Sequence, residues 1–210
     1  MPSSEYLRAL VALFVVVNPL GAVPAFLALT TDEGPRERAV TARVAALSVA
    51  VLLITSVFAG QAILAFVGIE VQHFKVGGGI MLLLVATTML NAQPSRSRET
   101  PEEMGEASER EQVGAVPLGT PLLAGPGSIS TAIIQADTLN TPQGRLWLVF
   151  VSLLVALATW VSLRGADGIR RVLGRTGINI ATRLEGLLLA ALAVRFIIDG
   201  LTVLMPGLTH

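Results

Sequence analysis

The chain has 210 residues, a formal net charge of zero, 52% hydrophobic residues and 14% charged residues, with a mean hydropathy of +0.69. Soluble domains carry roughly 25% charged residues. This composition therefore indicates a polytopic membrane protein, and it excludes a nucleic-acid-binding protein or a soluble enzyme.

Six apolar stretches follow in chain order, each about the length that crosses ~30 Å of hydrocarbon. They cover residues 6–29, 44–67, 74–90, 116–136, 146–163 and 184–205. The predicted fold is all-α, with six transmembrane helices in a single membrane domain over residues 1–210. We expect the first stretch to be a retained helix, because it is too long for a cleaved signal peptide and begins near Glu5.

Cysteine is absent, and the two histidines are His73 and His210. Disulfides and thiolate chemistry are therefore excluded, and these histidines cannot build a metal cluster. We expect no cofactor, no metal and no catalytic residues.

The distribution of Lys and Arg predicts the orientation, because basic residues near span ends stay in the cytoplasm. The odd-numbered loops hold eleven basic residues, and the opposite side holds three. The eleven are Arg36, Arg38, Arg43, Arg96, Arg98, Arg110, Arg164, Arg170, Arg171, Arg175 and Arg183, and the three are Arg8, Lys75 and Arg145. We expect a multi-pass protein of the bacterial or archaeal cytoplasmic membrane with both termini outside.

Two of the spans are interrupted near mid-depth by residues that cannot continue a helix. The first contains Asn18, Pro19, Leu20 and Gly21 with Pro24 nearby, and the fourth contains Gly125, Pro126, Gly127 and Ser128. Within lipid, the backbone groups freed by such a break must be satisfied by neighbouring helices, side chains or a wet cavity. Matched breaks in two halves of a membrane protein are typical of a transport site.

An internal repeat appears when the chain is shifted by 108 residues. Asn18 then lies on Pro126, Lys75 on Arg183 and Gly78 on Gly186. This predicts a first repeat over residues 1–92, a cytoplasmic linker over 93–115 and a second repeat over 116–210. Since each repeat holds an odd number of spans, the second must be inverted relative to the first.

The residues beside the breaks predict a binding site for a small zwitterion. We expect Ser128 to be the N-cap of the outer half-helix, so that free N–H groups and the hydroxyls of Ser128, Ser130 and Thr131 bind a carboxylate. Asn18 and the freed carbonyls would hold an ammonium group. A neutral substrate side chain is favoured, because no charged residue lies within a turn of either break.

Ionisable residues inside spans are costly and mark functional candidates. Arg195 and Asp199 are four residues apart in the sixth span, where they form either a self-neutralising pair or a proton-coupling carboxylate, Asp199, held by Arg195. We expect Glu185 to be interfacial and the outer boundary to hold Asp137 and Lys75. The run 77–79 of three glycines indicates helix packing.

Three segments together resemble the MarC family of membrane proteins. They are N-P-L-G-A-V-P-A-F (residues 18–26), P-L-L-A-G-P-G-S-I-S (121–130) and R-L-E-G-L-L-L-A-A-L (183–192). The resemblance covers nearly the whole chain and implies a secondary transporter of small neutral amino acids, grouped with the LysE-type exporters. The resemblance implies that the functional residues are Asn18, Pro19, Gly21, Pro24, Gly125, Pro126 and Gly127. It implies no role for Arg195.

The predicted function is alternating-access transport of a small zwitterionic amino acid, such as glycine, alanine or serine, between the two broken helices. The coupling ion, proton or sodium, stays open, as does a homo-oligomer within the bilayer. The alternatives are an uncoupled facilitator or exporter of another small solute and a non-transporting membrane scaffold. A membrane enzyme is disfavoured because the spans hold no catalytic constellation.

Overall fold

The computed structural model describes residues 3–31, 33–91, 123 and 125–205, and the regular elements in these ranges are helices. They are α1 (Ser3–Val17), α2 (Val23–Leu29), α3 (Pro35–Val67), α4 (Val71–Leu90), α6 (Pro126–Thr138), α7 (Pro142–Arg164) and α8 (Ala166–Leu204). The prediction of an all-α fold is confirmed. Within the described residues, four segments are long and apolar enough to cross a membrane, namely Pro35–Val67, Val71–Leu90, Pro142–Arg164 and Thr176–Leu204.

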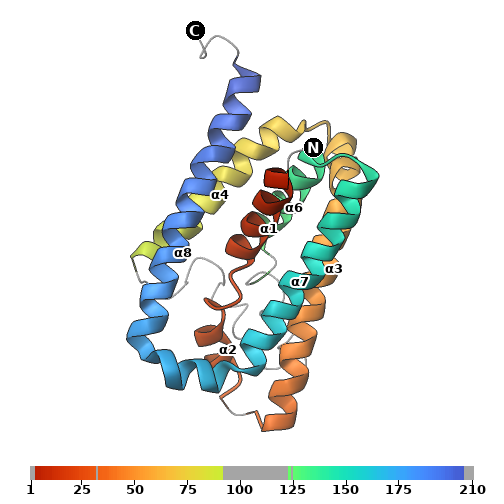
Figure 1. Ribbon diagram of the computed structural model, residues 1–210. Coiled ribbons are helices and arrows are strands. Elements are labelled where there is room, and N and C mark those ends of the chain that lie inside the picture. Colours follow the sequence, from red (N-terminus) through yellow and green to blue (C-terminus); the bar gives the residue numbers. More distant parts are fainter. Residues whose placement is uncertain (1–2, 32, 92–122, 124, 206–210) are drawn as a thin grey trace.

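The helices form two long pairs with shorter helices between them (Figure 1). Helix α4 lies along α8, and α3 lies along α7. One apolar core joins α1, α2, α3, α6 and α7. A second core joins α1, α4, α6 and α8. Helices α1 and α6 therefore contribute to both cores, which puts the two helices that border the predicted breaks at the centre of the molecule.

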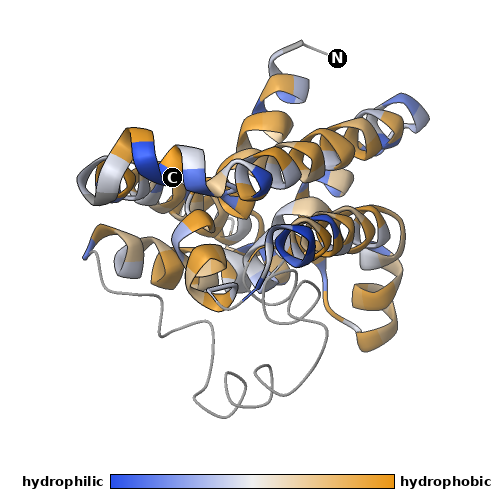
Figure 2. Cartoon of the chain, turned by 90° about the horizontal axis from the view of Figure 1, so that it is seen from below, coloured by the Kyte–Doolittle hydropathy of each residue, from blue (hydrophilic) through white to orange (hydrophobic). Residues whose placement is uncertain are grey.

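The outer surface of the bundle is apolar, as contact with lipid requires. Phe66 is 92% exposed and Val172 is 87% exposed, and large aliphatic side chains are exposed along α3, α7 and α8. Figure 2 shows hydrophobic residues on nearly every helix turn. Because water-facing patches of this extent are rare on soluble proteins, the surface supports burial of the bundle in a membrane.

Local sequence explains where the long helices begin and end. Pro35 starts α3 at a position where its missing N–H costs nothing, and Gly34 before it donates its N–H to Glu37 Oε2 at 2.7 Å. Gly68 ends α3 in the left-handed conformation with φ 78°. Helix α7 also begins with proline, and the Thr141 side chain caps it by accepting the Gly144 N–H at 3.0 Å.

Helix α8 changes direction at Gly174, where φ is 61° and ψ is −177°. Only glycine adopts this backbone conformation at low cost. The helix axis runs across the lower end of the molecule before the kink and rises along one side of the bundle, beside α4, after it (Figure 1). The predicted sixth span began at residue 184, whereas the membrane-length segment begins at Thr176.

The other predicted boundaries differ more at their starts than at their ends. Helix α3 begins at Pro35 rather than at residue 44, and α7 begins at Pro142 rather than at 146. The polar first turns of these helices are capped, so they extend beyond the apolar stretch. The predicted linker, residues 93–115, lies outside the described residues, as does most of the fourth span before Gly125.

Candidate functional site

The first predicted break is present between α1 and α2. Helix α1 ends at Val17, and Asn18 adopts φ 51°, a left-handed conformation that asparagine tolerates better than most residues. Asn18 Oδ1 accepts the Gly21 N–H at 2.7 Å, which satisfies one backbone donor freed by the break. A Cβ on Gly21 would collide with the Asn18 side chain, so this close turn requires glycine.

The two prolines of this break have different surroundings. Pro19 is buried together with Asn18, which is 7% exposed. Pro24 is exposed in the first turn of α2, where it assists helix initiation. Pro24 therefore belongs to the helix that follows the break, whereas Asn18 and Pro19 form the buried turn of the break itself.

The second break differs from the prediction in its capping. Gly125, with an extended backbone, is the N-cap of α6, Pro126 is the first helical residue, and Ser128 lies inside the first turn. The prediction of Ser128 as N-cap is wrong, because the fixed φ of Pro126 suits the first helical position and starts the helix earlier. The N–H groups of Ser128 and Ile129 both donate to the Gly125 carbonyl, at 3.0 and 3.1 Å.

Two hydroxyl groups in the first turns of α6 donate to nearby backbone carbonyls. Ser128 Oγ donates to the Leu123 carbonyl at 2.9 Å, and Thr131 Oγ1 donates to the Gly127 carbonyl at 2.8 Å. Ser128, Ser130 and Thr131 are all buried. Because two of these hydroxyl protons are already used, the positive end of the α6 dipole and the N–H of Gly127 are the stronger features for an anion.

The structure brings the two breaks together. A Cβ on Gly127 would lie 2.5 Å from Leu82 Cδ2 and 3.6 Å from Val16 Cγ1. Val16 precedes the first break by two residues, and Gly127 follows Pro126 directly. The start of α6 therefore packs against the end of α1, with α4 closing the third side.

A groove with a volume of about 760 Å³ leads to the second break between α4 and α6. Pro126, Ile129 and Ser130 line it from α6. The other lining residues belong to α4 and the turn before it, namely Gly68, Ile69, His73, Phe74, Gly77, Gly78 and Met81. The predicted packing role fits Gly78, which lies against Ser130, whereas a Cβ on Gly77 would meet open space.

Glu185 is a residue of this region that sequence reasoning missed. Its carboxyl contacts the side chain of Asn18, and Oε2 is buried with no hydrogen-bond partner among the described residues. The sequence predicted an interfacial position because Glu185 lies near one end of an apolar stretch. The contact depends on how α8 packs beside the break, and the only signal in the sequence was a carboxylate within a membrane-length apolar segment.

The predicted pair of Arg195 and Asp199 is present, with Nε 3.4 Å from Oδ2. Both side chains are about half exposed, at 50% and 47%, so the pair lies on the outer face of α8 and not among the residues of the breaks. Lys75 and Asp137 also pair, at 3.9 Å, and Gln61 Nε2 donates to Asp137 Oδ1 at 3.1 Å. This second cluster joins α3, α4 and α6.

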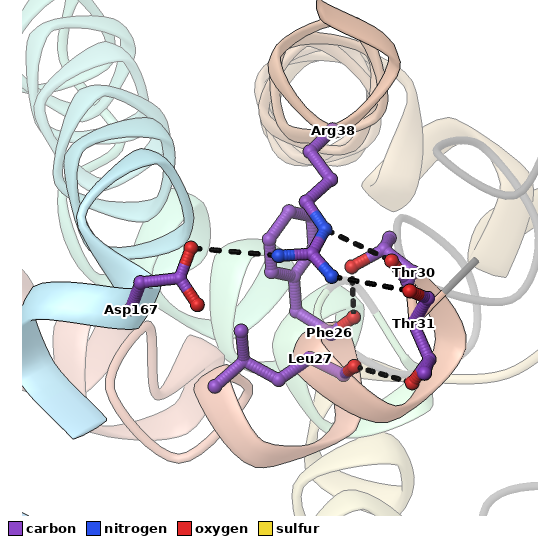
Figure 3. Close-up of polar contacts among 6 residues, drawn as sticks. All are labelled: Phe26, Leu27, Thr30, Thr31, Arg38 and Asp167. Atoms are coloured by element: carbon purple, nitrogen blue, oxygen red, sulfur yellow. Dashed lines mark hydrogen bonds and ion pairs between the residues drawn. The ribbon is translucent and has the colours of Figure 1, made fainter. Parts of the chain in front are cut away.

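At the opposite end of the molecule, Arg38 connects three segments (Figure 3). Its Nε donates to the Thr30 carbonyl at 2.9 Å, just past the end of α2. Its other nitrogens contact the Thr31 carbonyl and Asp167 Oδ2, each at 3.4 Å. Arg38 therefore satisfies carbonyls at the α2 terminus, a position where a positive charge is favourable.

No group of three or more His, Asp or Glu side chains within the described ranges is arranged to hold a metal ion. What the described residues form instead is a helical bundle with a lipid-compatible surface and, at its centre, the break at Asn18 beside the start of α6. This is the architecture of a multi-pass α-helical membrane protein.

Comparison with known proteins gives the family. A sequence model described as "MarC family integral membrane protein" matches residues 3–205, and the chain belongs to that family. It is 37% identical over 205 residues to "UPF0056 membrane protein YhcE" of Escherichia coli (strain K12), covering 98% of this chain and 95% of that protein. No solved structure matches the chain.

Two further relatives come from distant organisms. A UPF0056 membrane protein of Methanocaldococcus jannaschii is 36% identical over 202 residues, which cover 96% of this chain and 98% of the relative. One from Aquifex aeolicus is 35% identical over 196 residues, covering 93% and 92%. The resemblance inferred from the motifs around residues 18–26, 121–130 and 183–192 is confirmed.

Proposed function

We propose that this protein is a secondary transporter of small neutral amino acids, such as glycine, alanine and serine, and that the substrate binds between the broken helices. One observation carries the proposal: the break at Asn18 and the break at Pro126 adjoin at the centre of the bundle through Val16 and Gly127. Irregular backbone at membrane depth persists where it is enclosed by protein or lines a cavity, and paired broken helices are typical of transporter sites.

The chemistry beside the breaks supports a zwitterionic substrate. The N-terminus of α6 is positive and suits the substrate carboxylate, with the Gly127 N–H as donor. The carbonyls near Pro19 and the amide of Asn18 suit an ammonium group. No lysine or arginine lies within a turn of either break, and Gly21, Gly125 and Gly127 leave limited space, so the substrate side chain is small and neutral.

Two inverted three-helix repeats account for the order and direction of the helices. Each proposed repeat holds a broken helix followed by two long helices. Gly79 of α4 lies against Ile197 of α8 while Gly186 lies against Met89, so α4 and α8 are antiparallel. The ion pair of Arg38 with Asp167 joins the start of α3 to the first turn of α8, three residues past the end of α7, so α3 and α7 are antiparallel as well. Antiparallel pairing of equivalent helices is what inversion requires.

The proposed orientation puts both termini outside and the Arg38 end of the molecule in the cytoplasm. The bias of eleven basic residues against three supports it. In this orientation the groove between α4 and α6 opens toward the outer side, and alternating access proceeds by one repeat rocking against the other. The proposed location is the bacterial or archaeal cytoplasmic membrane.

Two other functions compete with coupled transport. An uncoupled facilitator or exporter would use the same site, and the groove that already reaches Pro126 favours such an open path. A non-transporting scaffold would use the breaks only for close helix packing, as Gly78 and Gly79 do. We do not propose an enzyme.

Uptake and efflux of labelled glycine, alanine and serine by proteoliposomes test the proposal, with proton and sodium gradients imposed in each direction. Accumulation driven by a gradient is the expected result. Equilibration without accumulation would favour the facilitator. If none of the three solutes moves, this substrate class is wrong, and a matched survey of other small solutes then separates another transporter from a scaffold.

A further inference from the structure

Glu185 is a partly buried carboxylate beside the first helix break. It lies in the membrane-length part of α8, contacts Asn18 and has Oε2 buried with no partner among the described residues. A buried polar atom without a partner is costly and calls for an explanation, which is often a functional one. In a membrane segment that cost is higher, because lipid provides no hydrogen bonds.

The ionisable residues of the neighbouring elements lie away from Glu185. Helix α2 contains none, and the stretch 81–90 of α4 contains none. The ionisable residues of helix α1 lie in its first two turns, about 15 Å along the helix from Asn18. The ionisable residues of α7 and α8 that are nearest to Glu185 in sequence are exposed. These residues are Glu5, Tyr6, Arg8, Arg164 and Arg183. The ion pairs among the described residues do not include Glu185.

Asn18 connects the charge of Glu185 to the geometry of the break. The amide oxygen of Asn18 is used, because it accepts the Gly21 N–H at 2.7 Å. The amide nitrogen is therefore the atom of this side chain that is free to donate to the Glu185 carboxyl that it contacts. Protonation of the carboxylate weakens the demand for this donor, since charge-assisted hydrogen bonds are roughly twice as strong as neutral ones. The protonation state of Glu185 thereby acts on the conformation of Asn18.

We propose that Glu185 is the proton carrier that couples a proton gradient to substrate movement, with Asn18 passing its protonation state to the break. A carboxylate oxygen takes a proton from water on one side of the membrane and returns it to water on the other, with no other bond made or broken. This proposal rests on the proposed transport function, and it assigns coupling to Glu185 instead of Asp199, whose charge is already paired with Arg195.

The test compares Glu185→Gln, Asp199→Asn and the control Glu70→Gln, which makes the same substitution at an exposed carboxylate in the turn before α4. Two assays use labelled glycine, alanine or serine in proteoliposomes. One measures exchange at equal pH on both sides, and the other measures accumulation in a pH gradient applied in each direction. One pH unit supports about tenfold accumulation when one proton moves with each substrate.

We expect Glu185→Gln to retain exchange and to lose accumulation, while Glu70→Gln keeps both. An independent readout is the infrared band of a protonated carboxyl that forms on acidification in wild type and disappears in Glu185→Gln. The proposal is overturned if the variant still accumulates substrate, if this band is missing, or if Asp199→Asn alone abolishes accumulation. Loss of exchange together with accumulation would make Glu185 a substrate ligand instead.

The same experiment separates the two proposals. If wild type moves no tested solute, the proposed transport function fails and the coupling role fails with it, whatever the infrared band shows. If wild type accumulates substrate and Glu185→Gln does so equally, transport stands and only the assignment of Glu185 is wrong.

Discussion

Val16 and Gly127 lie against each other although they border different helix breaks. A Cβ on Gly127 would lie 3.6 Å from Val16 Cγ1 and closer still to Leu82. The start of α6 thus packs at Gly127 directly against the side chains of Val16 and Leu82. Close approach of this kind is a common use of small residues between membrane helices, and it makes the contact sensitive to added volume.

Gly127→Ala should destabilise the protein by about 1–3 kcal/mol, because its Cβ would overlap the Leu82 side chain. Combined with Leu82→Ala, which removes the overlapping atoms, the loss should be smaller than the sum of the losses of the two single variants. Thermal unfolding in detergent measures both effects. Gly168→Ala is the matched control, since a Cβ there meets no atom within 4 Å. Equal melting temperatures for Gly127→Ala and Gly168→Ala would contradict the contact.

Asn18 should tolerate glycine better than valine, because its φ of 51° is unfavourable for a β-branched residue. Asn18→Gly loses the bond to the Gly21 N–H, at a cost of about 1 kcal/mol, together with the side-chain contact to Glu185. Asn18→Val loses the same interactions and adds about 1–2 kcal/mol of backbone strain. The order of unfolding temperatures, wild type above glycine above valine, checks this. A valine variant as stable as the glycine variant would show that the backbone at residue 18 is not left-handed.

Arg38 and Asp167 should differ in importance although they form an ion pair. Asp167 has a side chain 70% exposed, and exposed pairs contribute about 0–1 kcal/mol, so Asp167→Asn should leave stability nearly unchanged. Arg38→Ala should cost about 1–3 kcal/mol, because the carbonyls of Thr30 and Thr31 lose a charged donor. Measuring the unfolding of both variants at low and high salt separates the contribution of the ion pair from that of the hydrogen bonds to the carbonyls. A loss of stability for Asp167→Asn that equals that for Arg38→Ala would assign the energy to the ion pair instead.

The groove between α4 and α6 can be probed with cysteine, because the natural chain has none. Gly77→Cys should react with a membrane-impermeant thiol reagent added from outside, since a Cβ at Gly77 meets open space. Ala193→Cys, at a position that is 0% exposed, is the unreactive control. In transport assays, labelled Gly77→Cys should show reduced flux.

Reaction of Gly77→Cys only with reagent trapped inside would reverse the proposed orientation. Failure to react from either side, with a folded protein, would mean that the groove is filled in the membrane. Either result is informative because Gly77 lies on the same helix face as the groove residues His73 and Met81.

Several features could be predicted because they depend on local chemistry. The break at Asn18 and the start of α6 at Pro126 follow from proline and glycine, which cannot continue a helix whatever surrounds them. The Arg195 and Asp199 pair follows from a spacing of four residues on one helix. Local rules failed at Ser128, where a capping preference was outweighed by the fixed φ of Pro126 two residues earlier.

The sequence by itself determined the class of protein, the all-helical fold, the break at Asn18 and the family, because composition and backbone chemistry act over a few residues. The tertiary structure alone decided that Val16 meets Gly127 and that Glu185 meets Asn18. Those contacts join residues far apart in the chain, and they depend on the rotation and depth of packed helices. No local pattern specifies that rotation, so the carboxylate beside the first break became visible only when α8 was seen packed against it.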